Sequence, residues 1–172
     1  MSIRKTKPFL DAHAALRDRV EHLLVAAQEL PELDVEDRIE VVERISAFLA
    51  DMLLPHVAAE ERILYPQAAR LLGGPDESDC VARDRAAIRD LLGRLVACDC
   101  EDAGALQEVI YALYVLLSSH VWREEAVYLR LMEKGTIPEV KVMLDRVIDR
   151  SRPRRGRFRP RTRSTAQVTG AT

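Results

Sequence analysis

The sequence predicts an all-α protein, folded as an up-down four-helix bundle with a short fifth helix and a disordered basic C-terminal tail. Good helix formers (alanine, leucine, arginine and glutamate) are abundant, whereas the 172 residues include only 7 Gly, 8 Pro and 5% aromatic residues. Two stretches of the chain are imperfect copies of one helix pair, and duplication of a helical hairpin builds a four-helix bundle. A chain of this length is expected to form one domain whose core needs no cross-link.

The first two helices are predicted from proline positions and apolar spacing. The first helix is expected over about residues 8–29, because proline suits a first helical turn and Pro31 marks its end. The second is expected over 34–72, with apolar residues at helical spacing and two glycines after it. Pro55 lies inside this second helix and cannot donate a backbone hydrogen bond, so a kink is expected just before residue 56.

The remaining helices are predicted in the same way. The third helix should begin after Pro75 and end near residue 97, and the fourth should span about 102–133 with Gly135 as its stop. A fifth, shorter helix is expected over roughly 138–150. The four long helices alternate in direction because short connections join them.

The end of the chain differs sharply in composition from the rest. Residues 150–172 contain eight arginines and no acidic residue, which leaves 18 basic against 28 acidic residues in 1–149, a formal charge of −10. Because the arginine-rich stretch has too little apolar surface to fold, we expect a helical domain over 1–150 and a disordered tail over 151–172. Such a tail can solubilise the protein or bind nucleic acid or an acidic partner.

Several features are typical of a cytoplasmic protein. No apolar run approaches the ~20 residues of a transmembrane helix, and no apolar segment follows the basic N-terminus as in a signal peptide. The chain has 3 Cys, an odd number. Cys80 and Cys98 fall near opposite ends of one predicted helix, about 27 Å apart, so they cannot form a disulfide with each other. We therefore expect reduced cysteines and no membrane association.

The duplicated units each contain the motif His-x-x-x-Glu. The first is His56 with Glu60 and the second is His120 with Glu124. Residues four apart lie one turn apart on the same face of a helix, so each motif points an imidazole and a carboxylate in one direction. Iron, manganese and zinc accept these ligands. The two motifs therefore predict a metal site between helices.

Alignment of the two copies adds a residue from the first helix. The segment that begins at His13 aligns with the segment that begins at Arg85. His22 is excluded because it lies about half a turn away from His13 around the same helix. A guanidinium group only donates hydrogen bonds and cannot ligate a metal, so Arg85 supplies no ligand. The candidate metal ligands are His13, His56, Glu60, His120 and Glu124.

Arg85 is the residue that most affects the second copy. It can turn outward and leave that half of the site one imidazole short, or it can form an ion pair with Glu124 in the place of a second metal. Asp84 is a possible substitute ligand, although it points ~100° away. Glu61 and Glu125, which follow the motif glutamates, can line the bundle, face solvent or replace their neighbours.

The order of these residues resembles that of the hemerythrin-like HHE cation-binding domains. His13, the two His-x-x-x-Glu motifs and the segment 64–66 (Leu-Tyr-Pro) carry the resemblance, which covers roughly residues 8–133. It implies non-haem iron, and a role in binding, sensing or detoxifying dioxygen, peroxide, nitric oxide or iron. The family has a histidine where this chain has Arg85. That departure favours one iron over two, and it argues against reversible dioxygen carriage.

Two other classes of function remain open at this stage. A metal-dependent oxidative enzyme would need an open metal position and a substrate pocket, and the sequence indicates no catalytic residues for one. A metal-free helical interaction module would instead use the arginine-rich tail. Metal content separates this last class from the other two, whereas the oligomeric state cannot be inferred from the sequence.

Overall fold

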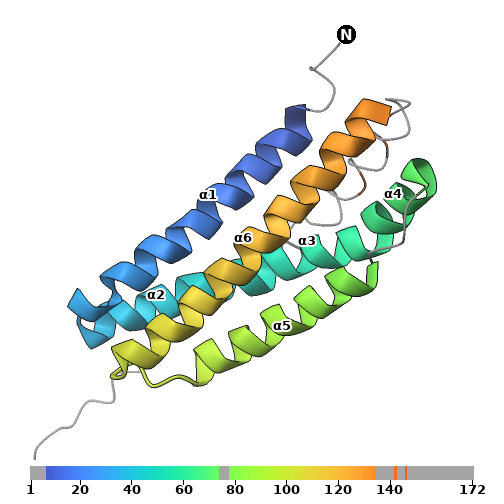
Figure 1. Cartoon of the computed structure of the whole chain (residues 1–172). Coiled ribbons are helices and arrows are strands. Elements are labelled where there is room, and N and C mark those ends of the chain that lie inside the picture. The colour runs from blue at the N-terminus through green and yellow to red at the C-terminus, as the bar shows by residue number, and fades with distance from the viewer. Residues whose placement is uncertain (1–6, 74–77, 135–141, 143–145, 147–172) are drawn as a thin grey trace, which may run out of the picture.

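Helices account for all the regular secondary structure in the residues that the computed structural model describes, which are 7–73, 78–134, 142 and 146. Four long rods pack side by side (Figure 1). They comprise α1 (Lys7–Glu29), a 3₁₀ turn η2 (Leu30–Glu32), α2 (Val35–Phe48), η3 (Leu49–Leu53), α3 (Leu54–Ala59), η4 (Glu60–Leu64), α4 (Tyr65–Leu72), α5 (Ser78–Ala97) and α6 (Ala103–Lys134).

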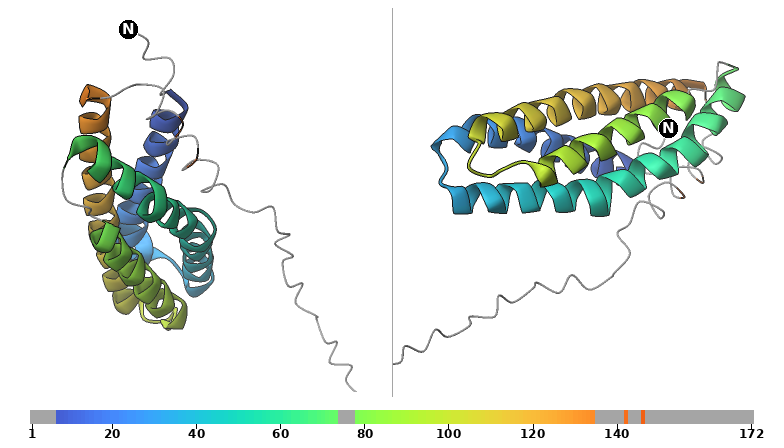
Figure 2. Two further views of the ribbon diagram at one scale, coloured as in Figure 1. Left: turned by 90° about the vertical axis from the view of Figure 1, so that its right-hand side faces the viewer. Right: turned by 90° about the horizontal axis from the view of Figure 1, so that it is seen from below.

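The rods form a four-helix bundle, as the sequence predicts. α1 packs along α6, and α5 packs against α6 and against the middle of the α2–α4 rod (Figure 1). Figure 2 shows the same packing from two further sides. None of the helices in the described part of the chain is long and apolar enough to cross a membrane. The predicted fifth helix and the arginine-rich tail lie outside the described residues, apart from positions 142 and 146.

Local capping explains where the second rod begins and ends. The Asp34 side chain accepts a hydrogen bond of 2.9 Å from the backbone N–H of Asp37 and so caps α2. Gly73 adopts a φ of 70° at the end of α4, a left-handed conformation that only glycine enters without strain. Arg38 links this rod to the opposite loop, because it donates to the carbonyls of Leu30 (3.1 Å) and Cys100 (3.3 Å).

Two π-helical turns interrupt the second rod. η3 ends where the N–H of Leu54 donates to the carbonyl of Leu49, and η4 ends where that of Tyr65 donates to Glu60. Each turn ends two residues before a proline, η3 before Pro55 and η4 before Pro66. A proline cannot donate to the carbonyl four residues back and its ring collides with that carbonyl, so the wider turn removes the clash. The kink predicted before residue 56 is thus a π-helical turn, and Pro66 imposes a second one.

The core is mainly aliphatic, and its buried polar residues form one cluster. Leucine is its commonest residue, and several leucines are inaccessible to solvent, among them Leu49, Leu53, Leu113 and Leu117. Among the described residues, the buried polar or charged side chains are His13, His56, Glu60, Asp84, His120 and Glu124. Burying such groups without partners is costly in free energy. Their position therefore marks a candidate functional site.

Candidate metal centre

Five of these six buried polar residues are the predicted ligands, and they come from three of the four rods. α1 supplies His13, the second rod supplies His56 and Glu60, and α6 supplies His120 and Glu124. Glu60 is the first residue of the π-helical turn η4, a kind of turn that is frequent at functional sites. Both glutamates and His120 have no accessible surface. The sequence motifs therefore converge at the centre of the bundle.

Four of the five candidate ligands surround one point. The ligating atoms of His13, His56, Glu60 and Glu124 all lie within 4.8 Å of one another. Nε2 of His56 is 2.9 Å from Oε1 of Glu60, and Nε2 of His13 is 3.3 Å from Oε2 of Glu124. The two imidazole rings are 5.6 Å apart between centroids. Two neutral imidazoles and two carboxylates around one point form a donor set suited to a divalent metal ion.

His120 lies on the other side of the two carboxylates. Its Nε2 is 2.8 Å from Oε1 of Glu124 and 3.5 Å from Oε2 of Glu60. The opposite oxygens, Oε1 of Glu60 and Oε2 of Glu124, face His13 at 3.9 and 3.3 Å. Each carboxylate therefore directs one oxygen to each side, as a bridging carboxylate does, but the His120 side has one imidazole and the other side has two.

The close approach of these groups shifts their pKa values in the metal-free protein. Burial is the largest single effect and favours the neutral form of His56, but the charge and hydrogen bond of Glu60 and the charge of Glu124 together outweigh it and raise the pKa of His56 to about 9. Burial and then the charge of Glu60 raise the pKa of Glu124 to about 7. Burial also opposes ionisation of Glu60, yet the charge of His56 and hydrogen bonds within the cluster together bring the pKa of Glu60 well below its ordinary value. Without a metal, protons partly neutralise this cluster.

Histidine 120 shows the same balance. Burial disfavours protonation of His120. The charge of Glu124 and the hydrogen bond with Asp84 nevertheless contribute to raising the pKa of His120 well above its ordinary value. The rise indicates that the carboxylates around this pocket favour a positive charge within it. Such a pocket stabilises any cation, whether a proton or a metal ion.

Arg85 points away from the cluster. Its guanidinium forms an ion pair with Glu61 at 2.8 Å, and the two side chains are about one-fifth exposed. Of the two arrangements considered from the sequence, the structure shows the one in which Arg85 does not pair with Glu124. Glu125, the other glutamate that follows a motif, pairs at 2.9 Å with the half-exposed Arg17. Neither following glutamate replaces its neighbour in the cluster.

Asp84 takes a place that was not predicted for it. Instead of pointing away, it is buried, and its Oδ2 lies 3.0 Å from Nδ1 of His120. The buried positions of α5 are Val81, Asp84, Ile88, Leu91 and Leu95. Their alternating spacing of three and four residues is the signal that identifies Asp84 as inward-facing. Alignment of the two copies had instead suggested that residue 85, the counterpart of His13, faces inward.

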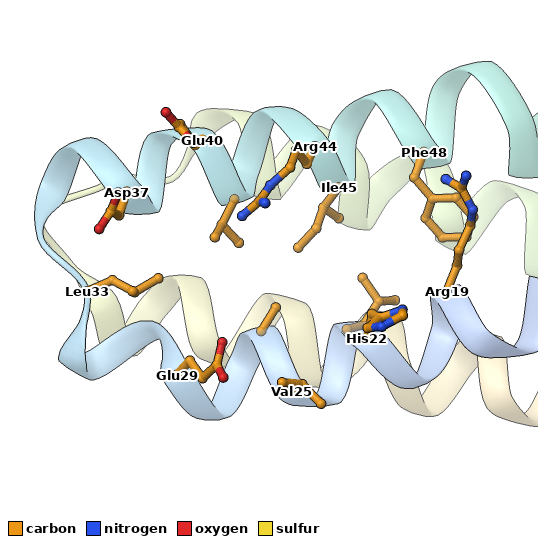
Figure 3. A pocket seen from close by; sticks show the side chains of 13 residues that line it. Arg19, His22, Val25, Glu29, Leu33, Asp37, Glu40, Arg44, Ile45 and Phe48 are labelled. Carbon is orange, nitrogen blue, oxygen red and sulfur yellow. The ribbon is translucent and has the colours of Figure 1, made fainter.

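A separate groove lies between α1 and α2, with a volume of about 750 Å³ (Figure 3). It is lined by His22 and by apolar residues such as Ile45 and Phe48, and none of the five candidate ligands borders it. His22, which the sequence excludes as a ligand, belongs to this groove and is exposed. The groove is therefore distinct from the buried cluster.

The buried polar atoms fit a metal ion. Within the described residues, Nε2 of His120 and both carboxylate oxygens of Glu124 are buried, and their close contacts are with other members of the cluster. A bound cation would neutralise the carboxylates and accept the lone pairs of the imidazoles together. Imidazole nitrogen and carboxylate oxygen are ligands for iron, manganese and zinc.

Comparison with known protein families identifies a family for this chain. Residues 5–146 match the Hemerythrin HHE cation binding domain. No curated protein and no solved structure was found to match the chain. The matched region includes every residue of the buried cluster.

Proposed function

Because the chain belongs to the hemerythrin HHE cation-binding domain family, we propose that it binds non-haem iron through His13, His56, Glu60 and Glu124, with His120 beside them. The carrying observation is the convergence of these four ligating atoms within 4.8 Å of one another in the buried centre of the bundle. Two histidines and a carboxylate are the ligands of many non-haem iron sites, and the second carboxylate adds charge neutralisation.

The burial of the site favours a small ligand. Glu60 and Glu124 are inaccessible to solvent and His56, the most exposed ligand, is only 9% exposed. Dioxygen, peroxide and nitric oxide are small enough to reach such a centre through side-chain motion, and iron would supply the redox and ligand-binding chemistry. We propose that the protein binds, senses or detoxifies one of these molecules, or iron itself. The protein residues would hold the ion, exclude bulk water and keep the pocket anionic.

The proposed stoichiometry is one tightly bound iron per chain. His13 and His56 complete one side of the carboxylate pair, whereas His120 is the sole imidazole that the described residues bring to the other side. Arg85 is engaged with Glu61. The second position is therefore weakened because an imidazole is missing there, rather than by a cation that occupies it.

The test is metal analysis of protein purified without oxygen. Iron at a fixed ratio to protein, and a change in the electronic spectrum on addition of dioxygen, peroxide or nitric oxide, would support the proposal. Turnover of a larger organic substrate would instead favour an oxidative enzyme. A folded protein that retains no iron, manganese or zinc after metal is supplied would contradict the proposal and favour a metal-free interaction module.

Metal affinity should depend on pH. A metal ion must displace the protons held by His56 (pKa about 9) and Glu124 (pKa about 7). Below pH 7 both groups carry protons, whereas between 7 and 9 only His56 does, and above 9 neither does. The apparent affinity should therefore rise with pH, by about tenfold per unit for each displaced proton. Competition titrations with Zn²⁺ from pH 6 to pH 9 measure this, and an affinity independent of pH would contradict it.

A further inference from the structure

Asp84 connects α5 to the buried centre through a histidine. It lies on α5, the rod that supplies none of the candidate ligands, and is 9% exposed. Its Oδ2 is 3.0 Å from Nδ1 of His120, and the same oxygen forms an ion pair with Arg123. Both ring nitrogens of His120 thus face carboxylates, with Asp84 at Nδ1 and Glu124 at Nε2.

This contact decides which nitrogen of His120 carries the proton. The carboxylate of Asp84 lies between the guanidinium of Arg123 and the imidazole of His120, and a carboxylate only accepts hydrogen bonds. Nδ1 of His120 must therefore be the donor in this contact. The lone pair of the neutral ring is then on Nε2, which is 2.8 Å from Glu124 and 3.5 Å from Glu60. That is the side on which a metal ion shared with the two carboxylates would lie.

The position of Asp84 excludes it as a ligand of the same ion. The carboxylate of Asp84 contacts the Nδ1 edge of the imidazole, whereas Glu60 and Glu124 contact the Nε2 edge. A carboxylate behind a ligating histidine fixes the orientation and tautomer of the ring and increases its basicity. The ion pair with Arg123, a residue of α6, in turn keeps the Asp84 carboxylate directed towards α6.

We propose that Asp84 is a positioning residue that presents Nε2 of His120 to a metal ion at the shared carboxylates. The proposal rests on the proposed metal-binding function and adds a role for α5, which contributes no imidazole. The pair of Asp84 and His120 would support metal binding on the side of the carboxylates where a second imidazole is missing. Arg123 would balance the charge of Asp84, so that the additional buried carboxylate is tolerated.

The test combines nitrogen NMR with metal affinity in the full chain. Zn²⁺ serves as a diamagnetic probe, and long-range ¹H–¹⁵N spectra report which nitrogen of His120 carries hydrogen. At Zn²⁺ concentrations that also fill the weaker position beside His120, Nδ1 in the wild-type protein should be protonated and Nε2 should show a metal-bound shift. The Asp84→Ala variant should lose this pattern and bind Zn²⁺ at that position about 10–100-fold more weakly, the usual effect of removing such a partner.

Two further variants separate positioning from a structural role. Asp84→Asn retains an oxygen that can accept from Nδ1, so its Zn²⁺ affinity and spectrum should lie between those of the wild-type and alanine proteins. Asp90→Ala removes an exposed aspartate from the same helix and should match the wild-type protein. If Asp84→Ala fails to fold, the asparagine variant carries the comparison. Circular dichroism establishes folding in each case.

The outcomes also distinguish this inference from the proposed function. A wild-type protein that binds metal, together with an Asp84→Ala variant whose His120 spectrum and Zn²⁺ affinity are unchanged, would overturn the role of Asp84 alone. A wild-type protein that binds no metal would overturn both proposals. A His120 ring protonated on Nε2 in the Zn²⁺-bound wild-type protein would overturn the role of Asp84 as well.

Discussion

Replacement of Glu60 with glutamine should weaken metal binding more than any other conservative change in the protein, by more than ~100-fold in apparent affinity. Oε1 of Glu60 lies 2.9 Å from His56, and Oε2 lies 3.5 Å from His120, so this carboxylate faces both sides of the centre. The amide has nearly the same shape but lacks the negative charge, and its NH₂ group would face the ion. Metal analysis and Zn²⁺ titration of the purified variant measure the loss.

The matched control for this change is His22→Ala. His22 is exposed in the groove between α1 and α2 and should have no influence on metal content. His56→Ala should behave like Glu60→Gln, because the two residues contact each other within the cluster. Both site variants should stay folded, since the core is mainly aliphatic. Metal content equal to that of the wild-type protein in Glu60→Gln would show that the ion binds elsewhere.

Removal of the metal should lower the melting temperature substantially. The ligands come from α1, the second rod and α6, so one ion would join three rods that the unfolded chain does not hold together. A ligand at 100 times its dissociation constant stabilises the folded state by ~2.7 kcal/mol. For a domain of this size, that corresponds to a shift of ~5–10 °C.

Thermal melts of metal-loaded and chelator-treated protein measure this shift. The difference should vanish in Glu60→Gln, which cannot hold the ion, and should persist in His22→Ala. A metal-loaded wild-type protein that melts at the temperature of the chelated protein would contradict a centre that spans three rods, and would place the bound ion on a single surface element.

The sequence was sufficient to predict the bundle and to bring the five candidate ligands together. The i, i+4 spacing within each motif depends only on helix geometry, so His56 with Glu60 and His120 with Glu124 had to share faces. The four-helix bundle follows from the duplicated helix pair. The domain boundary at residue 150 and the properties of the tail stay predictions.

The inward position of Asp84 required the structure. A shift of one residue rotates a side chain by ~100°, and alignment of the two copies cannot detect such a shift in α5. The choice of Arg85 as the counterpart of His13 rested on sequence similarity alone, whereas packing against α6 decides which residue is buried. Arg85 could also have paired with any nearby carboxylate, and only the fold brings Glu61 within 2.8 Å.

The π-helical turns have a consequence for how the length of this segment can vary between related sequences. A π-helical turn places residues i and i+5 about where an α-helix places i and i+4, so each turn accommodates one extra residue. Loss of one residue after Glu60 in η4 would therefore restore an α-helical turn and leave Tyr65 and Ala68, both buried, on the core side. A deletion in the α-helical stretches on either side would instead rotate every later side chain by ~100° and turn these residues out of the core. Single-residue deletions should therefore be tolerated better inside η4 than in the helices beside it.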